Sequence, residues 1–212
     1  MPLYLDKVNS DEWDEIKAFG AIWDDSRKKW FVRAQENYWR FRKWILRQGK
    51  IVICDHFYII EGKSKCYKCR NSSIVIGFGI ENFFEFGDVP EDKMRICFET
   101  GTIQIIESIG HLSLAFSFYL KQEYNYFQNQ NNTYLNHCAN CGAVRGNYYL
   151  FEEEDSPFCV DDEKTAEKLT LKRVKLQNDI ITNSDYHHSF ISYDYYIKNY
   201  SKFIDLNKYF NL

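Results

Sequence analysis

The sequence predicts an α+β fold made of a small N-terminal α/β module followed by a β-rich domain. Two observations lead to this prediction. The first fifty residues alternate short strand-like and helix-like runs. The later runs are instead short, rich in β-branched and aromatic residues, and separated by turn residues, which is typical of strands.

The chain is long enough for one large core or two small ones. It has 212 residues, of which 45% are hydrophobic and 18% aromatic, so it has enough apolar surface to fold. We expect a small basic α/β module over residues 1–50 and a β-rich domain over residues 51–160. Residues 161–212 form a Tyr-rich segment that should pack on the main body.

The N-terminal module should contain two strands and two helices. The first strand is expected over residues 2–8, and a helix with acids in its first turn should follow over residues 11–19. Gly20 ends this helix because glycine readily adopts the left-handed conformation. A second strand is expected over residues 29–33 and a second helix over residues 35–48.

The remaining chain shows mostly strand patterns. Strands are expected at residues 51–54, 57–61, 73–80, 95–99, 102–108 and 148–152. Thr100-Gly101 has the composition of a tight hairpin turn. Two segments, residues 110–123 and 161–181, fit either a helix or a strand.

Four cysteines form the strongest local pattern in the chain. Cys66 and Cys69 form one C-x-x-C sequence, and Cys138 and Cys141 form another, 68 residues further on. Each C-x-x-C turn directs two sulfurs to one point, and two such turns satisfy the tetrahedral demand of Zn²⁺. The sequence therefore predicts a split zinc-ribbon-like site of four cysteines in the β-rich domain. Since thiolates fill all four positions, the zinc should be structural.

The cysteines and histidines of the chain also allow other interpretations. A redox C-x-x-C or an iron–sulfur cluster is the alternative for the four cysteines. His137 adjoins the second pair and is a minor candidate ligand. The isolated cysteines, Cys54, Cys97 and Cys159, are typical of small core residues. Cys54-Asp55-His56 cannot be a triad, because consecutive strand residues point to opposite faces, and His187-His188 is expected at the surface.

Positive charge is concentrated near the N-terminus. The chain has a net charge of −3, which argues against a histone-type polyanion binder, but residues 26–50 contain nine basic residues and one acid. On a helical projection, a core-facing arc separates from a basic face, and Trp39 lies at the edge of that face. The resulting candidate contacts for nucleic acid or another partner are Arg27, Lys28, Lys29, Trp39, Arg40, Lys43 and Arg47.

The sequence shows no positive sign of catalysis or of membrane insertion. It contains no phosphate-binding glycine loop, nucleophile elbow or H-E-x-x-H sequence. Its longest apolar runs are well short of the ~20 residues that cross a bilayer. With no secretory signal pattern and seven cysteines, an odd number, we expect a cytoplasmic, non-enzymatic protein with thiols or metal ligands in place of disulfides.

The N-terminal residues resemble a small module of plasmid-type primases and other DNA-processing proteins of bacterial mobile elements. That module has a helix ending in K-A-L-G-A, then W-D and a K-W-Y-V strand. The matching positions here are Gly20, Ala21, Trp23, Asp24, Lys29 and Trp30. The resemblance implies an α/β mini-fold and a DNA-processing neighbourhood, without a substrate or a catalytic residue.

The cysteine-containing segments are similar to uncharacterised bacterial proteins that pair C-W-K-C with H-C-x-x-C-G-A-x-x-G. In this sequence Tyr67 stands where tryptophan is usual. The resemblance implies zinc on the same four cysteines.

Two functions follow from these patterns. In the first, a zinc-binding protein of a phage or plasmid associates with nucleic acid through the basic N-terminal helix, because Arg and Lys neutralise phosphates and exposed aromatics stack on bases. In the second, the chain is a regulator that docks on a host or defence protein and contacts no nucleic acid. The oligomeric state is left open.

Overall fold

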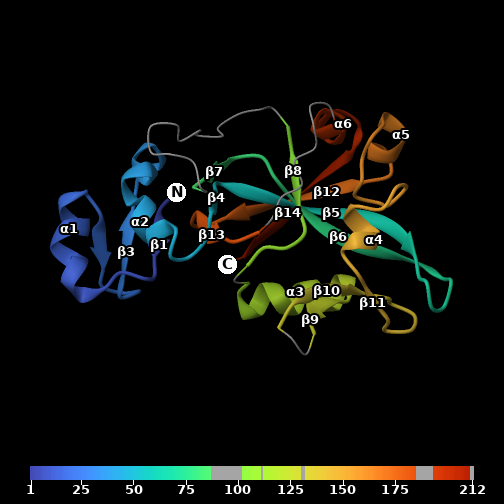
Figure 1. Cartoon of the computed structure of the whole chain (residues 1–212), viewed down its shortest axis with the longest axis horizontal. Coiled ribbons are helices and arrows are strands. Elements are labelled where there is room, and N and C mark those ends of the chain that lie inside the picture. The colour runs from blue at the N-terminus through green and yellow to red at the C-terminus, as the bar shows by residue number, and fades with distance from the viewer. Residues whose placement is uncertain (87–101, 111, 130–131, 185–192, 211–212) are drawn as a thin grey trace.

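The N-terminal elements lie at one end of the molecule (Figure 1). This structure is a computed structural model that describes residues 1–86, 102–110, 112–129, 132–184 and 193–210. The N-terminal elements are β1 (Leu3–Leu5), η1 (Ser10–Glu12), α1 (Trp13–Ala18), β2 (Ile22–Asp24), β3 (Lys29–Val32), η2 (Gln35–Phe41) and α2 (Arg42–Ile45). β3 is the central strand of the antiparallel sheet β1-β3-β2.

The second predicted helix is a 3₁₀ helix, η2, that continues into one α-helical turn, α2. Tyr38, Phe41 and Trp44 are spaced by three residues and are all fully buried. Because side chains at i and i+3 are aligned in a 3₁₀ helix, this geometry places the three rings in one row against the core. The predicted core-facing arc is confirmed. The helix predicted over residues 35–48 is present over residues 35–45, mostly as a 3₁₀ helix.

A five-stranded sheet in the order β14-β12-β5-β6-β8 forms the centre of the main body. Its members are β5 (His56–Lys65), β6 (Ser72–Ile80), β8 (Gln104–Ile106), β12 (Thr170–Leu176) and β14 (Lys202–Phe210). The β12–β14 pair is parallel and the other pairs are antiparallel. The C-terminal segment therefore supplies two strands of this sheet.

Helices cover both faces of the main sheet (Figure 1). Residues of α3 (Leu114–Tyr124) pack with Phe57 and Phe78 on one face. The opposite face packs against α4 (Tyr148–Phe151), α5 (Glu163–Ala166) and α6 (Tyr193–Tyr200).

A small sheet, β13-β4-β7, joins the N-terminal module to the main body. Its strands are β4 (Ile51–Ile53), β7 (Phe83–Glu85) and β13 (Ile180–Thr182). Ile51 and Ile53 belong to the core of the main body, while Val52 belongs to the N-terminal core. Since side chains alternate along a strand, β4 contributes to two cores at once.

Several sequence predictions are settled by these elements. The strands over residues 51–54, 57–61 and 73–80 are confirmed, with the second extended to Lys65. The strand over residues 148–152 is wrong: the segment is the helical turn α4, because it turns Leu150 and Phe151 inward together. Residues 95–99, Cys97, the Thr100-Gly101 turn and His187-His188 lie outside the described residues.

The two ambiguous segments are also assigned. The first segment supplies the helix α3, which begins at Leu114 and which Ser113 caps by accepting a hydrogen bond from the N–H of Phe116. Residues 161–181 contain both kinds of element, the short helix α5 and the strands β12 and β13. No helix in the described part of the chain has the length and apolar content to cross a bilayer.

Candidate metal centre

The two C-x-x-C sequences lie at the tips of two hairpins. The first is the turn between β5 and β6, where Lys65 pairs with Ser72. The second joins β10 (Tyr134–His137) to β11 (Val144–Arg145), where His137 pairs with Val144. We call residues 66–71 the first knuckle and residues 138–143 the second. A third strand, β9 (Tyr126–Gln128), extends the second hairpin.

The knuckles share one backbone design. In the first, the N–H of Arg70 donates to the carbonyl of Cys66 at 3.0 Å, and in the second the N–H of Gly142 donates to that of Cys138 at 2.9 Å. Arg70 and Gly142 both have a positive φ, 62° and 69°. This left-handed residue reverses the chain, which suits glycine and makes Arg70 an uncommon non-glycine example.

The four sulfurs converge on one point. Cys66 Sγ lies 3.7 Å from Cys141 Sγ, and Cys69 Sγ lies 3.6 Å from Cys138 Sγ. All four atoms are within 4.8 Å of one another. Metal–sulfur bonds of about 2.3 Å in a tetrahedron imply sulfur–sulfur edges of about 3.8 Å. The separations fit four ligands around one ion, and they are far longer than the ~2.05 Å bond of a disulfide.

Backbone N–H groups favour thiolates at the first cysteine of each knuckle. Hydrogen bonds from the N–H groups of Cys69 and Lys68 lower the pKa of Cys66. Those of Asn140 and Cys141 lower the pKa of Cys138 to about 6. These are the electrostatic conditions that a metal-binding thiolate requires.

The second cysteine of the first knuckle differs. A backbone hydrogen bond from Asn71 lowers the pKa of Cys69, but burial and hydrogen bonds with the other thiols outweigh it and raise the pKa to about 11. A bound cation would replace the protons that the sulfurs share, so metal binding should release protons.

Two buried polar residues hold the hairpins together, and sequence reasoning missed both. The Asn136 side chain accepts from the N–H of Ile76 at 2.7 Å and donates to its carbonyl at 2.8 Å. Arg145 donates to Ser64 Oγ and, at 2.8 Å, to the carbonyl of Lys65. Both residues lie close to the second knuckle in sequence, but nothing in the sequence shows what they contact.

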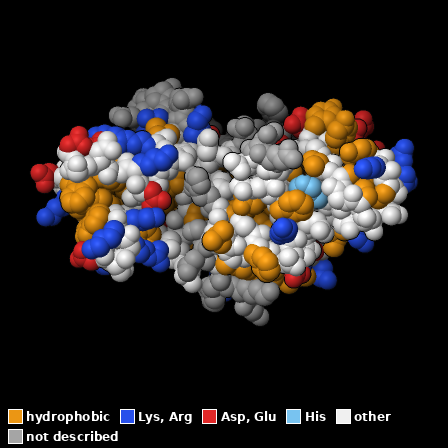
Figure 2. Space-filling view, turned by 90° about the horizontal axis from the view of Figure 1, so that it is seen from below, with side chains coloured by type: hydrophobic (Ala, Val, Ile, Leu, Met, Phe, Trp, Pro, Cys, Tyr) orange, Lys and Arg blue, Asp and Glu red, His pale blue; other side chains and the backbone are white. Residues whose placement is uncertain are grey.

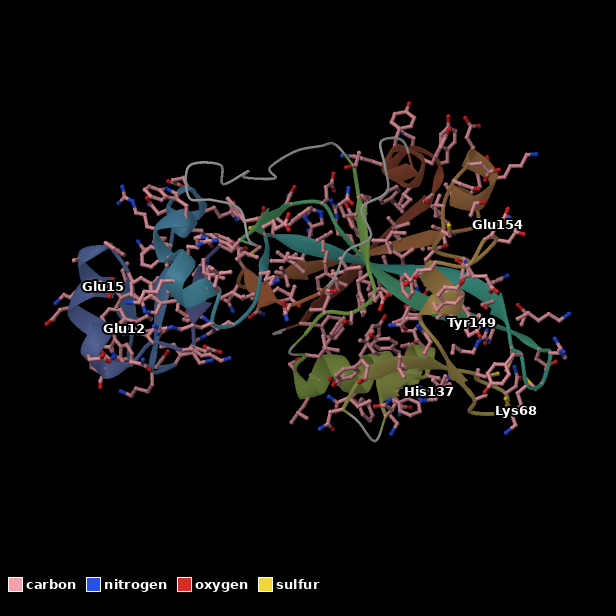
Figure 3. All side chains as sticks on the ribbon, viewed as in Figure 1. Glu12, Glu15, Lys68, His137, Tyr149 and Glu154 are labelled. Carbon is pink, nitrogen blue, oxygen red and sulfur yellow. The ribbon has the colours of Figure 1, made fainter. Side chains whose placement is uncertain are left out.

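His137 is not among the four clustered ligands. Its ring stacks on Phe127 with 3.7 Å between centroids, and Nδ1 lies 2.9 Å from the carbonyl oxygen of Leu135. In Figure 3, Lys68 lies at the end of the molecule that carries the knuckles, with sulfur atoms in yellow beside it, and His137 lies further from that end. Of the isolated cysteines, Cys54 is fully buried and Cys159 is partly buried.

At the opposite end of the molecule, two cations of the predicted basic face form ion pairs with acidic residues of the same chain. Arg47 contacts both carboxylate oxygens of Glu12, at 2.5 and 2.7 Å. Lys43 Nζ lies 2.8 Å from Glu12 and 2.7 Å from Glu15, and these two acids are labelled in Figure 3. Hydrogen bonds from Arg47 and then Lys43 hold the pKa of Glu12 well below its usual range. From the sequence, Glu12 is only one of the acids in the first turn of a predicted helix, with no sign of these ion pairs.

The other candidate residues except Lys28 line two separate grooves. Trp39, Arg40 and Lys43 line a groove of about 560 Å³, together with Phe19, Arg42, Glu15 and Ala18. Arg27 and Lys29 line a separate groove of about 410 Å³, next to Tyr4 and the buried Asp179. Arg27 lies over the Tyr4 ring at 4.6 Å, Lys29 pairs with Asp6 at 2.8 Å, and Lys28 lies 3.5 Å from Asp25.

Comparison with known proteins yields one match. Residues 3–45 match a protein family described as a domain of unknown function, DUF5710. The match runs from the first residue of β1 to the last residue of α2, about a fifth of the chain. No curated protein and no solved structure matches. The N-terminal module is thus similar to a family whose description assigns no activity.

Proposed function

We propose that this chain is a structural zinc protein in which the ion fastens two hairpins into a zinc-ribbon-like unit. The observation that carries the proposal is the convergence of four Sγ atoms from two matched knuckles. Four sulfur ligands at tetrahedral spacing suit Zn²⁺ and leave no coordination position for a substrate. The chain then acts by binding and not by catalysis, in the cytoplasm, where a reducing environment keeps thiols available.

Titration of the metal-free protein with Co²⁺ tests the ligand set. Four thiolates around Co²⁺ should give sulfur-to-metal absorption that saturates at one ion per chain, and Zn²⁺ should displace it. Cys138→Ser should weaken this absorption, and Cys159→Ser, at a cysteine outside the cluster, should not. Absence of sulfur-to-metal absorption in the wild type would contradict the proposal.

We also propose that the N-terminal module associates with nucleic acid through the groove beside Trp39. Trp39 is 49% exposed and Phe19 is 41% exposed, and the guanidinium of Arg40 lies 5.3 Å from the centre of the Trp39 ring. An exposed ring next to a cation can stack on an unpaired base while the cation approaches a phosphate. The resemblance to a primase-associated module supports a mobile-element setting for this activity.

Ion pairing narrows the proposed contact surface. Lys43 lines the groove but is shared with Glu12 and Glu15, and Arg47 is held by Glu12. Breaking these pairs would cost part of the energy gained from phosphate. Trp39 and Arg40 are therefore the principal contacts in the proposal, and Lys43 and Arg47 position the helix that carries them.

Anisotropy of a labelled single-stranded oligonucleotide at low salt tests this interface. Trp39→Ala and Arg40→Ala should each weaken binding about 5- to 100-fold. Lys168→Ala, at an exposed residue next to α5, is the matched control and should bind as the wild type does. If the wild type binds no nucleic acid at low salt, the interface proposal is wrong, and the same groove should be tested for a protein partner.

A further inference from the structure

The outer half of the β5–β6 hairpin has an unusual charge distribution. Residues 62–80 and 124–151 contain both knuckles and neither Asp nor Glu, although the chain has 30 such acids. Within the first of these segments lie four cations, Lys63, Lys65, Lys68 and Arg70. We call residues 63–74 the basic ribbon. Its composition contrasts with the acidic balance of the whole chain.

One face of the basic ribbon is directed to solvent. Lys63 pairs across the strands with Ile74, and Lys65 pairs with Ser72. Directly paired residues share a face, so these four exposed side chains lie together. Ser64 points to the other face, where it accepts a hydrogen bond from Arg145 of the second hairpin. The lysine-bearing face is therefore the one turned away from Arg145.

The tip of the basic ribbon carries an exposed aromatic ring. Tyr67 is 66% exposed, and no described residue makes a ring contact with it. It lies between Cys66 and Lys68, so its backbone is part of the first knuckle. The exposed ring does not contribute to the core. An aromatic side chain held in solvent beside cations is suited to stacking on a partner.

The ribbon cations differ from three of the cations at the N-terminal end. There, Lys29, Lys43 and Arg47 each pair with a carboxylate. In the described part of the chain, none of the four ribbon cations forms such a pair. Figure 2 shows Lys and Arg side chains at both ends of the molecule, and Figure 3 labels Lys68 at the end opposite Glu12 and Glu15.

The metal centre accounts for only part of this charge. Four thiolates around one divalent ion carry a net charge of about −2. The four ribbon cations exceed that charge, and Arg145 adds another positive charge beneath them. A surplus of unpaired cations on a ribbon is the electrostatic pattern of a polyanion-binding surface.

We propose that the basic ribbon binds a single-stranded nucleic acid, with Lys63, Lys65, Lys68 and Arg70 on phosphates and Tyr67 stacked on an unpaired base. The inference deepens the proposed function and depends on its zinc proposal, since the bound ion would fix the tip from which Tyr67 projects. Single strands are favoured over a duplex because an isolated projecting ring can stack only on a base that is not already stacked in a helix.

The test uses zinc-loaded full-length protein and a labelled oligothymidylate of about 20 nucleotides. Lys63→Gln combined with Lys65→Gln should weaken binding at least about tenfold and reduce the salt slope by about 1.4, because each phosphate contact on a single strand contributes about 0.7. Tyr67→Ala should weaken binding about 5- to 100-fold, and Tyr67→Phe should restore it. Lys164→Gln combined with Lys168→Gln is the matched control on α5 and its C-terminal side.

The outcomes separate this inference from the proposed function. Zinc is quantified in every variant, so loss of the metal is distinguished from loss of the binding surface. If Trp39→Ala abolishes binding while the ribbon variants bind as the wild type does, the ribbon inference is wrong and the groove proposal stands. The reverse pattern supports the ribbon and overturns the groove. Tighter binding to a duplex of the same length would also overturn the ribbon inference.

Discussion

Replacement of Asn136 by alanine should uncouple the two hairpins that carry the knuckles. Asn136 is 1% exposed, and its amide satisfies both the N–H and the carbonyl of Ile76 on β6. The side chain thus does what a neighbouring strand would do at this point. Asn136→Ala leaves two buried backbone groups without a partner, at about 1–3 kcal/mol each. We expect a loss of about 2–5 kcal/mol in the free energy of unfolding.

Urea unfolding of the zinc-loaded protein measures this loss. The midpoint should fall while the slope stays close to that of the wild type. Because Asn136 also fixes the second knuckle relative to the first, zinc affinity should fall about 10- to 100-fold, as when the groups that orient ligands are removed. Asn140→Ala, at an exposed residue of the second knuckle, is the control. A change below about 0.5 kcal/mol for Asn136→Ala would refute the reasoning.

Three further predictions concern other buried contacts. Burial raises the pKa of Asp179, so this residue contributes most to stability at low pH, where it is protonated. The free energy of unfolding of the wild type, relative to that of Asp179→Asn, should therefore fall as pH rises above about 4. A rise over this pH range would contradict the reasoning. The ion pairs of Glu12 lower its pKa, so the wild type should be more stable than Glu12→Gln at neutral pH. Thermal unfolding should show this stability difference declining below about pH 4. A difference that does not depend on pH would count against the pairing. Gly77→Ala places a methyl group 2.9 Å from the Phe151 ring, so urea unfolding should show a loss of about 1–3 kcal/mol, and unchanged stability would show that the ring moves freely.

The clustering of the four cysteines could be predicted from the sequence because a C-x-x-C turn is a local structure. Its backbone path follows from a few consecutive residues, and the need for four sulfurs pairs one turn with the other. The contacts that orient the turns could not be predicted in the same way. Asn136 meets Ile76 across 60 positions and Arg145 meets Lys65 across 80, so each depends on the completed sheet.

The basic face shows a different limit. A helical projection separated the buried row of Tyr38, Phe41 and Trp44 from the charged side, because periodicity reports which face is apolar. It carried no information on Glu12, which lies 35 positions before Arg47 and neutralises part of that face. The prediction of a strand over residues 148–152 is wrong for another reason: a short apolar run does not distinguish a strand from one helical turn.

Quantification of zinc in the purified protein tests the central claim most directly. We expect about one zinc ion per chain, retained in Cys159→Ser and lost in Cys66→Ser and Cys138→Ser. Removal of the ion with a chelator should unfold the two knuckles, because the binding free energy of a structural ion contributes to folding. A wild-type protein that carries no stoichiometric zinc, and whose knuckles are unaffected by the chelator, would contradict the account.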